Sequence, residues 1–202
     1  NTTGTDNTAC GAYALDDNST GTENTAVGYE SQLNTTTGIR NTSVGVDSLR
    51  TLTTGSNNTA VGWQCLISGT GDNNTAMGWQ ALMDGGSSNS AFGREALESC
   101  TGSDNTAVGF QAGQHITSGN NNLMLGHDAG KTGSPGGNFT THVNRITLGD
   151  ENIIEFNCQV SLSVASDERD KTDFTQLDIG LDFVKQLNPL TYRWDKRSKY
   201  GD

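Results

Sequence analysis

The chain repeats one short pattern of polar and apolar positions from near its first residue to past its middle. Each repeat has an Asn, usually a Thr, a small residue, an apolar residue and a Gly, as in Asn58-Thr59-Ala60-Val61-Gly62. A recurrence every 15 to 17 residues is too short for helix-pair repeats and predicts one coil of a parallel β-solenoid per repeat, about eight coils in all. The eight anchoring residues are Asn7, Asn24, Asn41, Asn58, Asn74, Asn89, Asn105 and Asn122.

The strand of each coil is expected at the Thr-Ala-Val segment. Alternate residues of a strand face opposite sides, so Thr59 and Val61 are expected on one face and Ala60 on the other. Because the Val position is apolar in every repeat, we predict that this column fills the interior. Its members are Cys10, Val27, Val44, Val61, Met77, Phe92, Val108 and Leu125.

The residues around the strand predict the turns of the coil. The Gly suits a corner with positive φ, and the Asn can stack on its neighbours into an amide ladder. An Ala-Leu pair after the Gly, such as Ala81-Leu82, indicates a second short strand or a corner. The second repeat departs from this pattern, since Ser31-Gln32-Leu33 contains one extra residue before the Leu.

The pattern changes after the eighth repeat. Residues 130–144 form a Gly/Pro/Ser-rich loop, and residues 144–149 supply a last strand that is expected to cap the solenoid. Apolar and polar residues then alternate from Ile154 to Val164, which predicts a half-buried strand. The predicted organisation is a repeat domain at 1–130, a loop and capping strand at 131–149, a trimeric β-strand stem at 150–166 and the short α+β start of another domain at 167–202.

Composition explains why a repeat architecture is needed. The chain has 202 residues, 26 of them Gly, and only 32% hydrophobic residues, which is poor material for a large globular core. Disordered chains of similar composition do not keep an apolar residue at a fixed distance from an Asn through eight copies. A coil this thin has little interior, so we expect three chains to share a core. The chain begins at Asn1 without Met or a signal peptide, and we expect it to be part of a longer polypeptide.

Charge and apolar content limit the partners. A net charge of −11, without a basic cluster, argues against nucleic-acid binding. No apolar run reaches the length of a membrane span, so membrane insertion is not expected. The four cysteines show no paired spacing, and we favour buried free thiols over a disulfide framework; they are Cys10, Cys65, Cys100 and Cys158.

The residue after the repeat Gly is the candidate for ligand binding. It is Ala12, Val46, Arg94 and His127 in four repeats and aromatic in the other four. A column of exposed aromatic rings could bind a saccharide, although packing between chains is the more frequent role of such a column. The candidate binding residues are Tyr29, Trp63, Trp79 and Phe110.

No metal site or cofactor is predicted. Acidic turns such as Asp72-Asn73-Asn74 match neither the EF-hand loop nor the calcium β-roll, and we interpret them as capping turns. His115, His127 and His142 share no metal-ligand spacing and have no evident Ser or Cys partner.

The Asn-Thr-Ala-Val-Gly repeats resemble those of bacteriophage tail fibres and, more distantly, the head repeats of trimeric bacterial autotransporter adhesins. The resemblance covers most of residues 7–130 and implies a trimeric, left-handed parallel β-roll.

The segment Ser166-Asp167-Glu168-Arg169-Asp170-Lys171 is the one candidate for chemistry, because a nearby Lys amine can act as the base for a Ser hydroxyl. This segment and the later Leu187-Asn188-Pro189-Leu190 resemble the start of the intramolecular chaperone domain of endosialidase-type tail spikes. That family trimerises its fibre and then cuts itself. The resemblance implies Ser166 as the nucleophile, Lys171 as its base and the bond between Ser166 and Asp167 as the one cut. Asp170 departs from the apolar residue that often precedes the Lys.

We therefore expect a structural virion protein, a phage tail fibre, that presents a homotrimeric rod for attachment to the host surface. It is not expected to be an enzyme, apart from single-turnover self-cleavage. The expected partners are other tail or baseplate proteins and a glycan or protein of the host, and the expected location is the virion, after assembly in the host cytoplasm.

Two alternatives belong to other classes. A trimeric adhesin on a bacterial cell surface would continue into a coiled-coil stalk and a membrane anchor. An enzyme acting on surface polysaccharide would need a pair of carboxylates in a cleft, and the acidic residues here lie in variable turns without a recurring pair.

Overall fold

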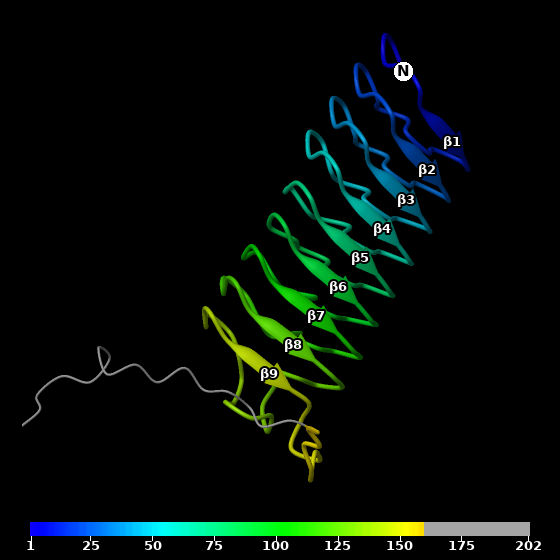
Figure 1. The fold of residues 1–202 in the computed structure, drawn as a ribbon. Helices are drawn as coiled ribbons and strands as arrows, with labels where there is room; N and C mark the ends of the chain where they lie inside the picture. The colour runs from blue at the N-terminus through cyan, green and yellow to red at the C-terminus, as the bar shows by residue number, and fades with distance from the viewer. Residues whose placement is uncertain (160–202) are drawn as a thin grey trace, which may run out of the picture. The chain divides into compact units, whose positions relative to one another are not determined.

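The computed structural model describes residues 1–159, and their regular secondary structure consists of short parallel strands. All the strands pair in sequence order within one sheet (Figure 1), which confirms the prediction of an all-β parallel solenoid. Equivalent residues of successive repeats are direct neighbours, as Ala60 is to Ala76. The strands are β1 (Thr8–Cys10), β2 (Thr25–Val27), β3 (Thr42–Val44), β4 (Thr59–Val61), β5 (Thr75–Met77), β6 (Ser90–Phe92), β7 (Thr106–Val108), β8 (Leu123–Leu125) and β9 (Ile146–Leu148).

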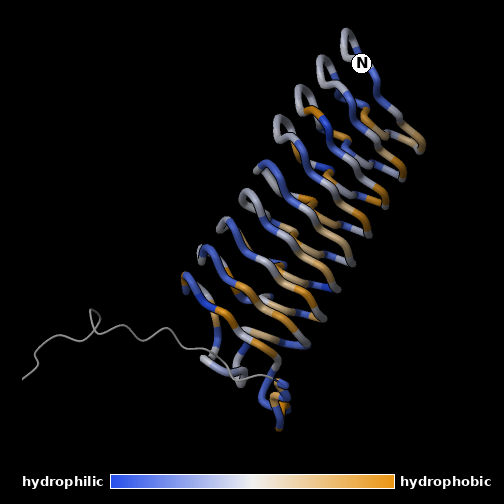
Figure 2. The backbone as a smooth tube through the Cα atoms, viewed as in Figure 1, coloured by the Kyte–Doolittle hydropathy of each residue, from blue (hydrophilic) through white to orange (hydrophobic). Residues whose placement is uncertain are grey.

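The interior of the solenoid is filled by the Ala column, so the prediction that the Val column lies inside is wrong. Ala60, Ala76 and Ala91 have no exposed surface, whereas Val44 is 40% and Met77 48% exposed. Thr59 and Val61 share one face of the strand, as predicted, but that face points outward. The coil is narrow, so a small strand residue fits opposite the Leu side chains that enter from the corner, and the larger Met124 of β8 lies beside Gly113. Figure 2 shows the apolar positions of successive coils lying beside one another.

The Ala-Leu pair forms a corner and no second strand. Leu66 has φ 52° and a fully buried side chain. Positive φ is uncommon for a Leu and costs free energy. Two contacts compensate for it: the side chain joins the core, and the Leu66 N–H donates to the Ala81 carbonyl of the next coil at 3.0 Å. The same backbone conformation recurs at Leu49, Leu82 and Leu97.

The second repeat contains no extra residue at this corner. Gln32 takes the place of the Leu, with φ 51° and a buried side chain. Its Nε2 donates to the Thr25 carbonyl at 2.8 Å and to Ser43 Oγ at 2.9 Å. Ser43 itself replaces an Ala of the inner column, so two polar substitutions compensate each other inside the core.

The Asn ladder and the Gly corner are both present as predicted. Asn74 donates through Nδ2 to the Gly86 carbonyl at 2.7 Å and accepts the Asn89 N–H at 2.9 Å. Gly78 has φ 142°, and a Cβ added there would lie 2.4 Å from the Gly93 carbonyl oxygen. A residue other than Gly would therefore separate the neighbouring coils at this corner.

More residues separate β8 from β9 than separate the earlier pairs of successive strands. Equivalent residues are 23 positions apart here, against 15 to 17 in the earlier coils. The additional residues fold as a loop that places Phe139 in the buried cluster at this end of the core. The Phe139 N–H donates to the Gly130 carbonyl at 2.8 Å, and its ring stacks on His142 at 5.0 Å.

The coils and their last loop belong to one compact unit, Asn1–Phe156. Residues 153–159 contain no strand, and Ile154 and Phe156 are exposed. The trimeric stem predicted at 150–166 requires three chains and extends beyond the described residues, so it stays a prediction.

Two of the four cysteines fit the expected buried thiol. Cys65 and Cys100 are free and buried, and burial raises the pKa of the Cys65 thiol to about 12. Cys10 and Cys158 are exposed, contrary to the prediction. For Cys10 the reason is the inverted sheet, because the third strand position points outward.

Candidate functional site

The residues that follow the repeat Gly lie in one column along the corner of the coils. Parallel pairing without slip places Trp63, after β4, next to Trp79, after β5. The same register continues through Arg94, Phe110 and His127 to Asp150, which follows β9. We call these six residues the corner row.

The side chains of the corner row contact one another without a gap. The rings of Trp63 and Trp79 are stacked, with centroids 5.7 Å apart and an interplanar angle of 7°. The Arg94 guanidinium lies 4.3 Å from the Trp79 ring centroid and 5.4 Å from that of Phe110. Phe110 stacks on His127 at 5.2 Å, and His127 contacts Asp150. Aromatic rings therefore lie on both sides of the Arg94 guanidinium, as cation–π attraction favours.

Three of the four predicted binding residues belong to this row. Tyr29 does not, because Val46 separates it from Trp63; its ring meets Tyr13 edge-on at 6.0 Å. A hydrogen bond with Glu30 raises the pKa of Tyr29 and lowers the pKa of Glu30, whose carboxylate also contacts Arg50 Nε at 2.6 Å.

The row offers ring edges to solvent. Trp63 is 43% exposed, but one of its faces lies against Trp79, and the opposite face of Trp79 lies against Arg94. A saccharide that stacks on an aromatic ring needs an open face. Contacts along the ring edges, with a partner that itself repeats along the solenoid, fit this geometry better than stacking on a single ring.

A polar row runs next to the corner row, one residue further along each coil. Gln80 Nε2 donates to Gln64 Oε1 at 2.9 Å, and Lys131 Nζ donates to Gln111 Oε1 at 2.6 Å. Glu95 accepts from Gln111 and Arg94, and the Gln111 hydrogen bond is the main cause of a lowered pKa for the Glu95 carboxyl. Hydrogen bonds between coils thus hold the side chains beside the aromatic rings.

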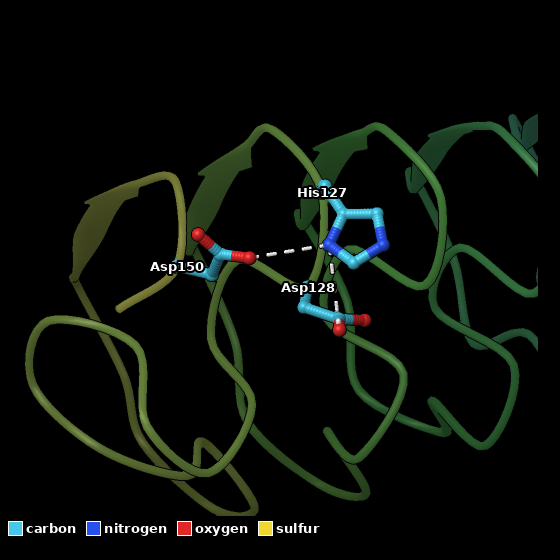
Figure 3. A group of neighbouring side chains, drawn as sticks. All are labelled: His127, Asp128 and Asp150. Atoms are coloured by element: carbon cyan, nitrogen blue, oxygen red, sulfur yellow. Dashed lines mark hydrogen bonds and ion pairs between the residues drawn. The ribbon is translucent and has the colours of Figure 1, made fainter. Parts of the chain in front are cut away.

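The corner row ends at a group of one imidazole and two carboxylates (Figure 3). His127 Nδ1 lies 3.2 Å from Asp150 Oδ2 and 3.4 Å from Asp128 Oδ2. Asn152 donates to both oxygens of Asp150, which is the main cause of the lowered pKa of that carboxyl. Lys131 Nζ contacts Asp128 Oδ1 at 3.0 Å.

Neither a role for His127 nor this group was predicted from the sequence. Asp150 follows Gly149 as His127 follows Gly126, so the repeat register itself could have aligned the two residues. The longer step between β8 and β9 concealed that alignment, because it breaks the period of 15 to 17 residues.

The acidic turn at Asp72 caps the backbone, as predicted. Asp72 Oδ1 accepts the Ser56 N–H at 2.7 Å, and the Asp72 N–H donates to Ser87 Oγ at 3.2 Å. The carboxylate thus joins its own coil to a neighbour.

An open groove of about 350 Å³ lies where β7, β8 and β9 begin. Thr106, Leu123 and Ile146 line it, together with one carboxylate, Asp104, and one cation, Arg145. Glycoside hydrolysis generally needs a pair of carboxylates. This groove contains a single carboxylate, that of Asp104.

The residues predicted to carry out self-cleavage, Ser166, Asp167 and Lys171, lie outside the described residues. A comparison with known protein families covers these three residues. Residues 166–202 match the family model described as chaperone of endosialidase.

The chaperone of endosialidase match begins at Ser166, the nucleophile implied by the resemblance. It agrees with the resemblance stated for this segment, and it covers the C-terminal part of the chain only. No curated protein and no solved structure matches the chain. Within residues 1–159 there is no helix long and apolar enough to cross a membrane.

Proposed function

We propose that this chain is part of a phage tail fibre, a homotrimeric rod that projects from the virion and attaches it to the host surface. The observation that carries the proposal is the order of two parts along the chain. A parallel β-solenoid comes first, and a chaperone of endosialidase segment follows it at 166–202. Because its coils are alike, a repetitive rod can pair with its copies in the wrong register. An intramolecular chaperone that follows the rod along the chain can set the correct register.

The outer face of the sheet supports association with further copies of the chain. The first and third residues of each strand point outward, and the third is apolar in every coil, as at Val108 and Leu125, which are 42% and 37% exposed. A partner can make the same contact at every coil only if it has the same axial repeat. A second and a third copy of the chain meet this requirement.

The outward face becomes more apolar at β8 and β9. The first strand position is Thr or Ser from β1 to β7, but Leu123 and Ile146 occupy it in the last two strands. Ile146 is 71% exposed. At about 25 cal/mol per Å² of buried apolar surface, covering these residues contributes more than covering the Thr residues of the earlier coils. We therefore place the tightest contact between copies at β8 and β9.

Sedimentation of the full-length protein tests the association. A trimer is expected for the wild type. A variant with Leu123→Thr and Ile146→Thr is expected to form a weaker trimer, with a higher dissociation constant. These substitutions install the Thr that β1 to β5 and β7 already have at this position, so the coil itself is not expected to change. Thr106→Ser is the matched control. A monomeric wild type contradicts the proposal.

Self-cleavage is the second element of the proposal. Ser166 is the proposed nucleophile, Lys171 its base, and the bond to Asp167 the one cut. Denaturing mass analysis of the full-length protein should give a product that ends at Ser166. Ser166→Ala should abolish the product, whereas Ser163→Ala should leave it unchanged. A single uncut species in the wild type contradicts self-cleavage.

Attachment to the host is the third element. The corner row and the outer face are the surfaces that we propose for contact with a glycan or protein of the host. Labelling of purified virions with an antibody against residues 1–159 should mark the tail. Labelling of bacterial cells that carry no phage would favour the adhesin alternative.

A further inference from the structure

The group at the end of the corner row has the donor atoms of a metal site. His127 and Asp128 come from the corner after β8, and Asp150 from the equivalent corner after β9. One donor atom from each of the three side chains lies within 4.8 Å of the other two. Donors from two successive coils therefore converge on one point.

The two separations from the imidazole nitrogen fit the size of a transition-metal ion. Zinc binds imidazole nitrogen and carboxylate oxygen at about 2.0 to 2.2 Å, which places two donors of a tetrahedral site about 3.4 Å apart. His127 Nδ1 is 3.2 Å from Asp150 Oδ2 and 3.4 Å from Asp128 Oδ2.

Both carboxylates approach the same ring nitrogen. One N–H can point at only one acceptor, so a proton on Nδ1 leaves the other carboxylate without a well-directed hydrogen bond from the imidazole. A cation among the three donors satisfies all of them at once. This distinguishes the group from an ordinary pair of a His and an Asp.

The surrounding residues hold the donors in place. Phe110 stacks on the His127 ring with an interplanar angle of 12° and fixes its orientation. Asn152 and Lys131 hold Asp150 and Asp128 through hydrogen bonds and an ion pair. Such partners of metal ligands raise affinity by fixing the ligand geometry.

We propose that His127, Asp128 and Asp150 bind a divalent transition-metal ion such as Zn²⁺, which joins the last coil to the one before it. One nitrogen and two carboxylate oxygens suit zinc, cobalt or nickel better than the oxygen-binding ions calcium and magnesium. The ammonium of Lys131 repels a cation, so we expect micromolar and not nanomolar affinity. The inference does not depend on the function proposed above.

The ion would close the solenoid at its irregular step. The coils up to β8 follow one another every 15 to 17 residues, whereas β9 follows a step of 23 residues. A bond from each side of that step to one ion would stabilise β9 against fraying, since ligands that bind only the folded state raise its stability.

Titration of the full chain, freed of metal with a chelator, tests the proposal with Co²⁺ and Zn²⁺ as probes. The titration is run near pH 7.5, because ligands must be deprotonated to bind a metal ion. Visible absorption of Co²⁺ should report one ion per chain, and calorimetry should show Zn²⁺ competing for the same site. Zn²⁺ should also raise the midpoint of thermal unfolding.

Variants decide whether these three residues are the ligands. Asp150→Asn and His127→Phe, which preserves stacking on Phe110, should each weaken Co²⁺ binding by at least about tenfold. His115→Gln and Asp104→Asn are matched controls outside the group and should bind as the wild type does. Circular dichroism identifies any variant that fails to fold. Wild-type protein without Co²⁺ absorption, or equal binding by both sets of variants, would overturn the proposal and leave an ion pair of His127 with its two carboxylates.

Discussion

Asn58 Oδ1 accepts the backbone N–H of Asn74, one coil further along, at 3.0 Å. It also accepts Asn74 Nδ2 at 3.0 Å, and Asn74 repeats both contacts to Asn89. Each buried amide thus satisfies a backbone donor that the strand ladder leaves without a partner. The ladder runs from Asn7 to Arg145 N and joins every coil to the next.

Replacing one amide of this ladder should destabilise the solenoid. Asn74→Asp removes the Nδ2 donor to the Gly86 carbonyl and places a buried carboxylate next to that oxygen and Asn58 Oδ1. The expected cost is about 2–4 kcal/mol of unfolding free energy, measured by chemical denaturation at neutral pH. Asn73→Asp adds the same charge at an exposed neighbour and should cost less than about 1 kcal/mol. Equal costs would show that charge alone, and not the ladder, matters.

The Gly corner should be the least tolerant position of the coil. A Cβ at Gly78 would approach the Gly93 carbonyl oxygen to 2.4 Å at φ 142°, where neither backbone can move without breaking the sheet register. Gly78→Ala should cost at least about 3 kcal/mol. Gly137 also has positive φ, but nothing lies within 4 Å of its Cβ position. Gly137→Ala should therefore cost only the backbone strain, about 1–2 kcal/mol.

The Asn ladder and the Gly corner could be predicted from the sequence because they rest on backbone needs. A repeated positive φ requires Gly, and a repeated unpaired N–H requires a short acceptor, whatever the rest of the coil does. The period also fixed the parallel register, since each coil can only pair with a copy of itself.

Which face of the strand is buried could not be read from periodicity alone. The alternation groups Thr59 with Val61 and separates them from Ala60, but it does not say which group faces inward. Val is more hydrophobic than Ala, but hydrophobicity does not decide which of the two faces inward. What decides is volume, because Leu66 and its equivalents already occupy the narrow interior. The group around His127 was missed for a different reason: it joins residues on either side of an irregular step.

Enlarging a residue of the narrow interior should destabilise the solenoid. Ala76 is fully buried between its neighbours Ala60 and Ala91. Ala76→Leu adds three carbon atoms to this space and should cost about 1–3 kcal/mol through overpacking. Thr75→Val, at the outward-facing position before it, should change the unfolding free energy by less than about 0.5 kcal/mol in the monomer. If Ala76→Leu were as stable as the wild type, the inner face would have to be assigned again.

The polar row should make the solenoid less stable in acid. The hydrogen bond from Gln111 keeps the pKa of Glu95 below its ordinary value of 4.5 in the folded protein. Because the folded pKa is the lower one, the contribution of the carboxylate is fully present above the unfolded pKa. It is lost as the pH falls from about 4.5 through the folded pKa. Chemical denaturation at a series of pH values from 7 to 3 should therefore show a decline in stability at the acid end.

The variant Glu95→Gln separates this effect from the titration of the other carboxylates. It keeps the size of the side chain and removes the titrating group, so its stability should be lower than that of the wild type at pH 7. The difference between the two proteins should shrink as the pH approaches 3, because protonated Glu95 and the glutamine that replaces it are both neutral. A constant difference across the series would mean that Glu95 acts through packing, and that its hydrogen bonds with Gln111 and Arg94 do not depend on its charge.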